Sequence, residues 1–186
     1  MPKARDIIII AGLSGVGKTY VINHLLQQFG TNYKNFSAGS LIKKRISSLA
    51  YDDLCKLDKN SVLQNQQLLV EQFNEELLET DKNFTILFDA HMVIDNHKEV
   101  IEIPYEIFKQ LLPTKIIFLF DEPEKIITRR KNDESRKRHI RTTQEIKEQQ
   151  DHSAMLAKKY ARLLSIPLIE IKVSDTELLK IIRGLC

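Results

Sequence analysis

Apolar residues along this chain follow two alternating patterns, which are short continuous runs and longer stretches with helical spacing. Short runs of β-branched and apolar residues are typical of strands that are buried on both faces of a parallel sheet. These runs predict strands at residues 6–11, 84–88, 115–120 and 168–173, with a weaker candidate at residues 34–36.

The stretches between the runs place apolar residues three or four positions apart, which predicts amphipathic helices. One stretch contains Val62, Leu69, Val70, Phe73 and Leu77, and another contains Ile146, Met155, Leu156, Tyr160 and Leu163. Strands that alternate with helices predict βαβ units in a doubly wound α/β domain. Ligands of such sheets bind beyond the carboxyl ends of the strands, so we expect the functional residues there.

Four amide residues, at positions 64–67, lie inside the first helical stretch. We expect that helix to be capped by Asp58, Asn60 or Ser61, because their side chains can accept hydrogen bonds from free backbone N–H groups. A solvated helix face is the favoured interpretation of the amides, and contact with an acceptor base is the alternative.

The sequence Gly-Leu-Ser-Gly-Val-Gly-Lys-Thr at positions 12–19 follows the first predicted strand and matches the P-loop pattern. Glycines let backbone N–H groups turn toward phosphate oxygens, and the start of the next helix adds partial positive charge. We expect Lys18 to bridge the β and γ phosphates of ATP and the Thr19 hydroxyl to bind Mg²⁺. The predicted nucleotide-binding residues are Gly12, Ser14, Gly15, Val16, Gly17, Lys18 and Thr19.

A bound magnesium nucleotide also needs a carboxylate, and two predicted strands lead into an aspartate. Asp89 follows the run at residues 84–88, and Asp121 follows the run at residues 115–120. Because this carboxylate belongs on a strand beside the P-loop strand, we favour Asp89. The sequence after Asp121 is Glu-Pro-Glu, which is typical of a helix start, so we interpret Asp121 as structural.

The composition is that of an ordinary globular protein, with 186 residues, 42% apolar residues and 28% charged residues. This length suits one domain. Cys55 and Cys186 lie far apart without metal-ligand spacing, which argues against a zinc site or a disulfide framework and favours a cytoplasmic location. The apolar run at residues 7–13 is too short for a transmembrane helix.

The formal net charge of +3 is concentrated in one segment. Residues 129–141 contain seven Lys or Arg and two acidic residues, a net +5, so the remaining 21 basic and 23 acidic residues amount to −2. Arginine forks are suited to clamping phosphoryl oxygens, whereas the lack of aromatic residues in this segment argues against single-stranded nucleic acid as the ligand. A solvated charged helix face is the alternative interpretation.

Together these motifs resemble the P-loop nucleoside monophosphate kinases, most closely the archaeal-type adenylate kinases, over residues 7–182. Asp89-Ala90-His91 is similar to the family's Asp-x-His, and residues 129–138 with Thr142-Thr143 are similar to its lid. The resemblance implies one P-loop kinase domain over residues 1–186, with a three-layer α/β/α fold and a five-stranded parallel sheet. It also implies an acceptor-binding helical segment at residues 37–80 and a short Arg-rich lid at residues 129–143.

The activity that the resemblance implies is transfer of the γ-phosphoryl group of MgATP to a nucleoside monophosphate. Lys18, Arg129, Arg136 and Arg138 would be the catalytic residues, and Asp175 would lie where backbone groups hold the adenine. By the same resemblance, the acceptor would be bound by Ser37, Gly39, Lys43 and His91, and Mg²⁺ by Thr19 and Asp89.

The acceptor side departs from the family pattern. Lys43 stands where many adenylate kinases have the arginine that holds the AMP phosphate, and Cys55 and Ser153-Ala154 also replace residues that include arginines. Lysine supplies charge but no bidentate fork. Two alternatives therefore stay open: a P-loop kinase of another small metabolite or of a polynucleotide 5′-hydroxyl, and a nucleotide-dependent ATPase switch that acts on an assembly partner.

Overall fold

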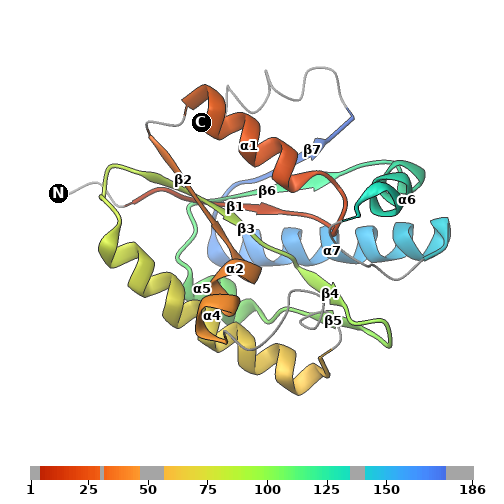
Figure 1. Ribbon diagram of the computed structural model, residues 1–186, viewed down its shortest axis with the longest axis horizontal. Helices are drawn as coiled ribbons and strands as arrows, with labels where there is room; N and C mark the ends of the chain where they lie inside the picture. Colours follow the sequence, from red (N-terminus) through yellow and green to blue (C-terminus); the bar gives the residue numbers. More distant parts are fainter. Residues whose placement is uncertain (1–4, 30–31, 47–56, 135–140, 175–186) are drawn as a thin grey trace.

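A computed structural model describes residues 5–29, 32–46, 57–134 and 141–174 of the chain. Its centre is a five-stranded parallel sheet with the strand order β2-β3-β1-β6-β7 (Figure 1). The strands are β1 (Ile7–Ala11), β2 (Tyr33–Ser37), β3 (Thr85–Asp89), β6 (Lys115–Phe120) and β7 (Leu168–Lys172). All the strands predicted from the apolar runs are therefore confirmed, including the weaker candidate that became β2.

Helices cover both faces of this sheet. The helix after the P-loop, α1, lies on one face, and α4, α5 and α7 lie on the other (Figure 1). The helices are α1 (Lys18–Phe29), α2 (Ala38–Arg45), α4 (Lys59–Glu79), α5 (Tyr105–Gln110), α6 (Pro123–Asn132) and α7 (Thr143–Leu164). This is the expected three-layer α/β/α architecture. Across the described ranges, no helix is long and apolar enough to span a bilayer.

The central strand β1 is buried on both faces, which explains its run of four isoleucines. Ile8, Ile9 and Ile10 are fully buried. The ring of Phe73 on α4 packs edge-on against Phe36 on β2 and Phe88 on β3, and so joins the helix layer to the sheet. Burial of such side chains is the main stabilising contribution to a core of this kind, and it holds the carboxyl ends of β1 and β3 in fixed positions.

A small antiparallel hairpin lies outside the main sheet and was not predicted. It consists of β4 (Val93–Asp95) and β5 (Val100–Glu102). Strands of this length are too short to show an alternating pattern in the sequence. Between them, the Asn96 side chain accepts hydrogen bonds from the N–H groups of Lys98 and Glu99 and closes the turn.

Helix α4 begins as expected at one of its three candidate caps, because Asp58 accepts a hydrogen bond from the Ser61 N–H at 3.1 Å. The interpretation of residues 64–67 as a solvated face is wrong for two of the four amides. Asn65 and Gln66 are buried at 7% and 5% exposure, whereas their neighbours at 64 and 67 are exposed. The two buried amides continue the core-facing row of the helix, since they lie three and four residues after Val62.

Helix α7 begins with a capping box formed by Thr142 and Glu145. Its buried face includes Ile146, Leu156 and Tyr160, as the helical spacing predicts. Met155 and Leu163, which were counted with that apolar face, are instead 56% and 50% exposed.

Candidate active site

The P-loop leaves the carboxyl end of β1 and runs into the first turn of α1. Its glycines have positive φ angles, and Gly12 has a φ of +148°. A Cβ atom at Gly12 would lie 2.5 Å from the backbone oxygen of Leu119 on β6. Only glycine therefore lets the loop pass this close to the neighbouring strand.

Lys18 of the P-loop is 6% exposed and its ammonium group is turned back onto the loop. Its Nζ atom donates to the backbone oxygens of Gly12 at 3.0 Å and Leu13 at 3.2 Å. The same atom lies 3.8 Å from Oδ1 of Asp89. Lys18 therefore has a carboxylate beside it. Its hydrogen bonds to the two carbonyl oxygens could be replaced by hydrogen bonds to phosphate oxygens.

Asp89 is the last residue of β3, and His91 lies two residues after it. Strand β3 pairs directly with β1, so that Asp89 lies opposite Ile10. Nδ1 of His91 lies 3.1 Å from the backbone oxygen of Gly12 and 3.4 Å from Nζ of Lys18. The two contacts require different tautomers of His91, because the carbonyl oxygen of Gly12 only accepts hydrogen bonds and the ammonium of Lys18 only donates them. Asp89 and His91 are thus brought together with Lys18 at the start of the P-loop.

Asp121 follows β6, which is the other neighbour of β1. The rule that the carboxylate lies beside the P-loop strand therefore fits both aspartates, and their contacts distinguish them. Asp121 is 2% exposed and accepts from Ser174 Oγ at 2.6 Å and from Arg129 Nη2 at 2.6 Å. Burial raises the pKa of the Asp121 carboxyl, but the hydrogen bonds from Ser174, Arg129 and the Glu122 N–H outweigh it and lower that pKa. Asp121 holds an arginine, whereas Asp89 lies beside the P-loop lysine.

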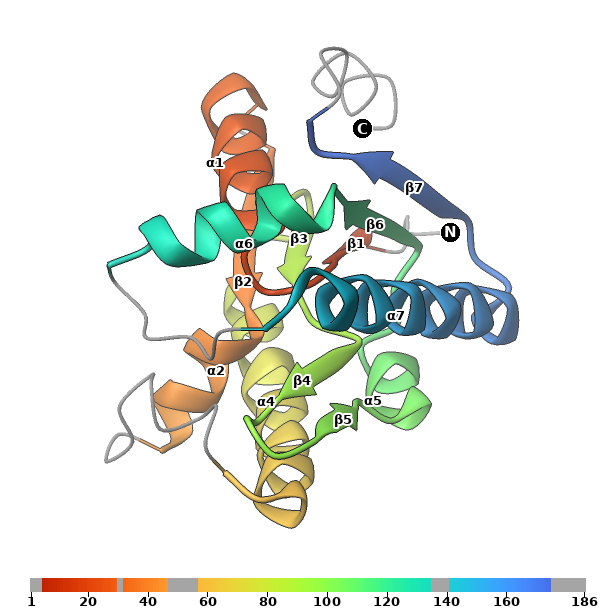
Figure 2. The ribbon, with the colours of Figure 1, turned by 90° about the vertical axis from the view of Figure 1, so that its right-hand side faces the viewer.

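The end of α6 brings two consecutive arginines to the outside of the P-loop. Arg129 donates through Nη1 to the backbone oxygen of Val16 at 2.9 Å. Arg130 donates through Nε to the backbone oxygen of Ser14 at 2.8 Å. Figure 2 shows α6 lying across the start of α1. No separate role was predicted for Arg130, since nothing in its local sequence distinguishes it from the other basic residues of the segment.

The predicted acceptor-binding residues begin beside Asp89. Ser37 lies opposite Asp89 in the ladder between β2 and β3, and it precedes α2, which contains Gly39 and Lys43. Helix α2 is fastened to α4 by ion pairs of Lys44 with Glu76 and of Arg45 with Glu75.

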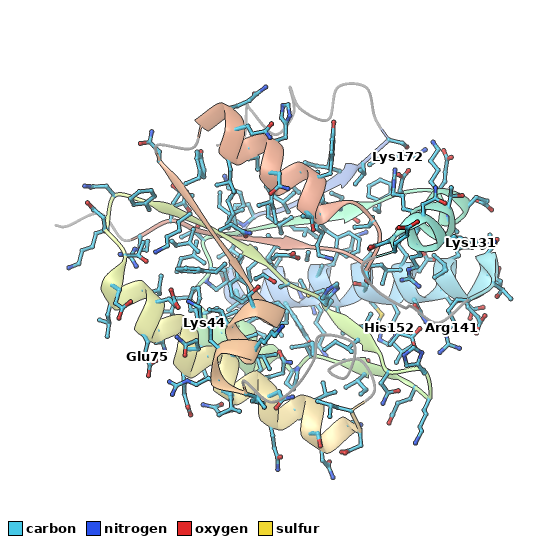
Figure 3. The ribbon with its side chains drawn as sticks, in the orientation of Figure 1. Lys44, Glu75, Lys131, Arg141, His152 and Lys172 are labelled. Atoms are coloured by element: carbon cyan, nitrogen blue, oxygen red, sulfur yellow. The ribbon has the colours of Figure 1, made fainter. Side chains whose placement is uncertain are left out.

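The turn of the β4–β5 hairpin is tied to the end of the predicted lid and to α7. Arg141, labelled in Figure 3, forms a two-pronged ion pair with Asp95, with Nε–Oδ2 at 2.9 Å and Nη2–Oδ1 at 2.8 Å. Gln149 also donates a hydrogen bond to Asp95. Burial raises the pKa of Asp95, but hydrogen bonds from Arg141, Gln149 and the His97 N–H hold that pKa well below its usual range. On the other side of the turn, Asn96 donates to the backbone oxygen of Leu57 at 3.1 Å.

Arg136, Arg138 and Asp175, which the sequence analysis placed in the site, lie outside the described residues. Among the described residues, no cluster of three His, Cys, Asp or Glu side chains could hold a metal ion. Thr19 and Asp89 nevertheless fit Mg²⁺, because a hydroxyl and a carboxylate are hard oxygen donors and Mg²⁺ usually takes its remaining ligands from phosphates and water.

The model of the AAA domain family matches residues 11–147 of the chain. An adenylate kinase of Pyrococcus horikoshii is 31% identical over 160 residues, which cover 83% of this chain and 80% of the relative. An adenylate kinase of Methanocaldococcus jannaschii is 28% identical over 189 residues, which cover 97% of this chain and 96% of the relative.

Among solved structures, the 1.7 Å crystal structure of shikimate kinase from Bacteroides thetaiotaomicron is similar in fold, with a TM-score of 0.53. The two chains are 13% identical, and the superposition covers 98% of this chain and 97% of the other. At this identity the similarity identifies the architecture, a P-loop kinase fold, and not the substrate.

Proposed function

The chain belongs to the AAA domain family and to the family of the archaeal adenylate kinases, and on this premise we propose that it transfers the γ-phosphoryl group of MgATP to a nucleoside monophosphate. It is a nucleoside monophosphate kinase-like phosphotransferase. What we propose is that the acceptor is a nucleoside monophosphate and that the residues of the candidate site have the roles given below. A cytoplasmic location belongs to the proposal as well, supported by two cysteines without disulfide or zinc spacing.

One observation carries the proposal, which is that residues predicted to bind ATP and residues predicted to bind the acceptor lie at the same edge of the sheet. Lys18 follows β1 and lies 3.8 Å from Asp89, which ends β3. Ser37 ends β2 and lies opposite Asp89 in the ladder. A phosphate bound by the P-loop and a group bound by α2 would therefore approach each other across Asp89, as an in-line transfer requires.

The residues of the P-loop would bind the polyphosphate of ATP. Phosphate oxygens would replace the carbonyl oxygens of Gly12 and Leu13 as acceptors for Nζ of Lys18. Mg²⁺ bound with the nucleotide, held by Thr19 and Asp89, would neutralise charge between the β and γ phosphates. Arg129, Arg136 and Arg138 would offset the charge that develops during transfer.

The acceptor phosphate would lie near α2. Lys43 on α2 would attract that phosphate by its positive charge, but it would not bind two phosphate oxygens at once as an arginine does. The adenine of ATP would be held after β7 by backbone groups at Asp175, and Ser174 next to it already bonds to Asp121. His91 would contact the acceptor, because its ring lies beside Gly12 and Nζ of Lys18, two residues after Asp89.

A screen of acceptors tests this proposal. Purified protein is incubated with MgATP and AMP, CMP, UMP, GMP or their deoxy forms, and ADP is measured against a reaction without acceptor. At least one monophosphate is expected to raise ADP formation well above the acceptor-free rate. If none does while ATP binds, transfer to a nucleoside monophosphate is excluded.

Adding small hydroxyl metabolites and polynucleotides with a 5′-hydroxyl to the screen addresses the second candidate function, which is phosphorylation of such a hydroxyl. Lys43 favours that alternative, since it stands where the resemblance expects an AMP-binding arginine. ADP formation that depends on such a hydroxyl compound and on no monophosphate would support it. ATP hydrolysis that responds only to RNA or protein would instead support a nucleotide-dependent switch.

A further inference from the structure

We propose that Arg130 is a positioning residue that orients the P-loop backbone for phosphate, an inference that rests on the proposed function. Nε of Arg130 donates to the backbone oxygen of Ser14 at 2.8 Å, from a residue 116 positions away in the sequence. Arg129 makes the equivalent contact two residues further along the loop, to the backbone oxygen of Val16. Arg129 and Arg130 therefore hold alternate carbonyl groups of the loop.

Holding these carbonyls determines where the following N–H groups point. In a trans peptide the C=O of one residue and the N–H of the next are coplanar and point in opposite directions, and the described chain contains no cis peptide. The carbonyls of Ser14 and Val16 point toward α6, so the N–H groups of Gly15 and Gly17 point away from it. Among the backbone hydrogen bonds of the described residues, none is donated by Gly15 or Gly17. These two groups are thus the donors that a phosphate would use.

Packing at Gly15 supports the same role for Arg130. Gly15 has a φ of +83°, and a Cβ atom there would lie 2.7 Å from Cγ of Arg130. The aliphatic stem of Arg130 therefore lies directly on the loop, while its Nε atom reaches the carbonyl next to it. The contact limits both the position and the orientation of the peptide between Ser14 and Gly15.

Side-chain geometry allows the hydrogen bond and the charge of Arg130 to be separated. Glutamine places its Nε2 donor at the same number of bonds from Cα as Nε of arginine, but carries no charge. Lysine keeps the charge but places a methylene at that position, and methionine places a methyl group there and has neither charge nor donor. Arg130→Gln therefore removes the charge alone, Arg130→Lys removes the donor at this position alone, and Arg130→Met removes both.

The test measures dissociation constants of ATP and of tripolyphosphate by calorimetry, without acceptor. Arg130→Met and Arg130→Lys are expected to weaken both ligands by about tenfold or more, the effect of one hydrogen bond to a charged group, while Arg130→Gln stays within about threefold of wild type. Equal losses for the two ligands are expected because the loop contacts phosphate and not the base. In ligand-free protein, the NMR chemical shift of the Gly15 amide proton should change in Arg130→Lys and Arg130→Met but not in Arg130→Gln.

Lys125→Gln is the matched control, because Lys125 lies on the same helix before the predicted lid and its side chain is exposed. It removes one positive charge without touching the loop and should leave both dissociation constants unchanged. Wild-type affinity in Arg130→Lys with a loss in Arg130→Gln would overturn the proposal in favour of a simple charge effect. Wild-type affinity in all three variants would overturn it outright. Failure of the wild-type protein to bind ATP would contradict the proposed function instead.

Discussion

The carboxylate of Asp121 and the guanidinium of Arg129 are joined by a hydrogen bond of 2.6 Å between Oδ2 and Nη2. The second nitrogen of the same guanidinium bonds to the P-loop at Val16. Asp121 itself is fixed at its backbone by Gln150, which accepts from its N–H at 3.1 Å and donates to its C=O at 2.9 Å. A continuous set of hydrogen bonds therefore runs from α7 through the end of β6 to the P-loop.

Asp121→Asn should lower the free energy of unfolding by about 2 kcal/mol, because it leaves the Arg129 guanidinium without its charged partner. It should also weaken ATP binding, since Arg129 loses its support. Urea unfolding and calorimetry measure the two effects. Glu71→Gln, at an exposed acidic residue in the middle of α4, is the control and should change neither. Equal stability of both variants would show that the ion pair contributes nothing.

Lys18→Ala should lower turnover by about 100-fold or more while the fold is retained, because the charge that meets the transferring phosphoryl group is removed. Steady-state ADP formation and far-UV circular dichroism are the measurements. Lys125→Gln, with the same loss of charge on the surface, should keep full activity. An active Lys18→Ala enzyme would contradict the assigned P-loop role.

Gly12→Ala should destabilise the protein by about 2 kcal/mol or more and abolish ATP binding, because the added Cβ meets the Leu119 carbonyl and the φ of +148° is strained for alanine. The midpoint of urea unfolding and the ATP dissociation constant are measured together. A variant that unfolds and binds ATP like wild type would mean that the loop does not pass β6 this closely.

The ion pair of Asp95 and Arg141 should make stability depend on pH in the acid range. The folded-state pKa of Asp95 lies well below its ordinary value of 3.8, so its contribution is fully present above that value and is lost as the pH falls toward the folded-state pKa. The stability difference between wild type and Asp95→Asn should therefore be largest near neutral pH and shrink below about pH 4.

A double-mutant cycle with Arg141→Met isolates this pair, with an expected coupling of about 1 to 3 kcal/mol at neutral pH. Asp151→Asn, which removes an exposed partner of Lys147, is the control and should cost less than about 0.5 kcal/mol. A difference between wild type and Asp95→Asn that grows on acidification has the opposite sign and would refute the assignment.

The main sheet could be predicted from the sequence because its strands are buried on both faces and therefore appear as continuous apolar runs. The β4–β5 hairpin could not, since Val93–Asp95 and Val100–Glu102 are too short to show a period. The amides Asn65 and Gln66 were misplaced for a related reason: local composition indicated a solvated face, but the packing of α4 buried them.

The candidate site was predictable to the extent that its chemistry is local. The P-loop is recognised from its sequence pattern, and Asp89-x-His91 comes at the end of a recognisable strand. The choice between Asp89 and Asp121 was argued from the sheet neighbours of β1, yet both of their strands flank it. Only the contacts of the two carboxylates, one beside Lys18 and the other on Arg129, separate them.

Local signals were enough to predict the apolar strands, the capped helices and the phosphate-binding loop. Which distant side chains contact that loop depends on tertiary packing. Arg129 and Arg130 reach Val16 and Ser14 across 113 and 116 positions. No short-range pattern records such a contact, because it exists only after strands distant in the sequence have paired and brought α6 against the P-loop.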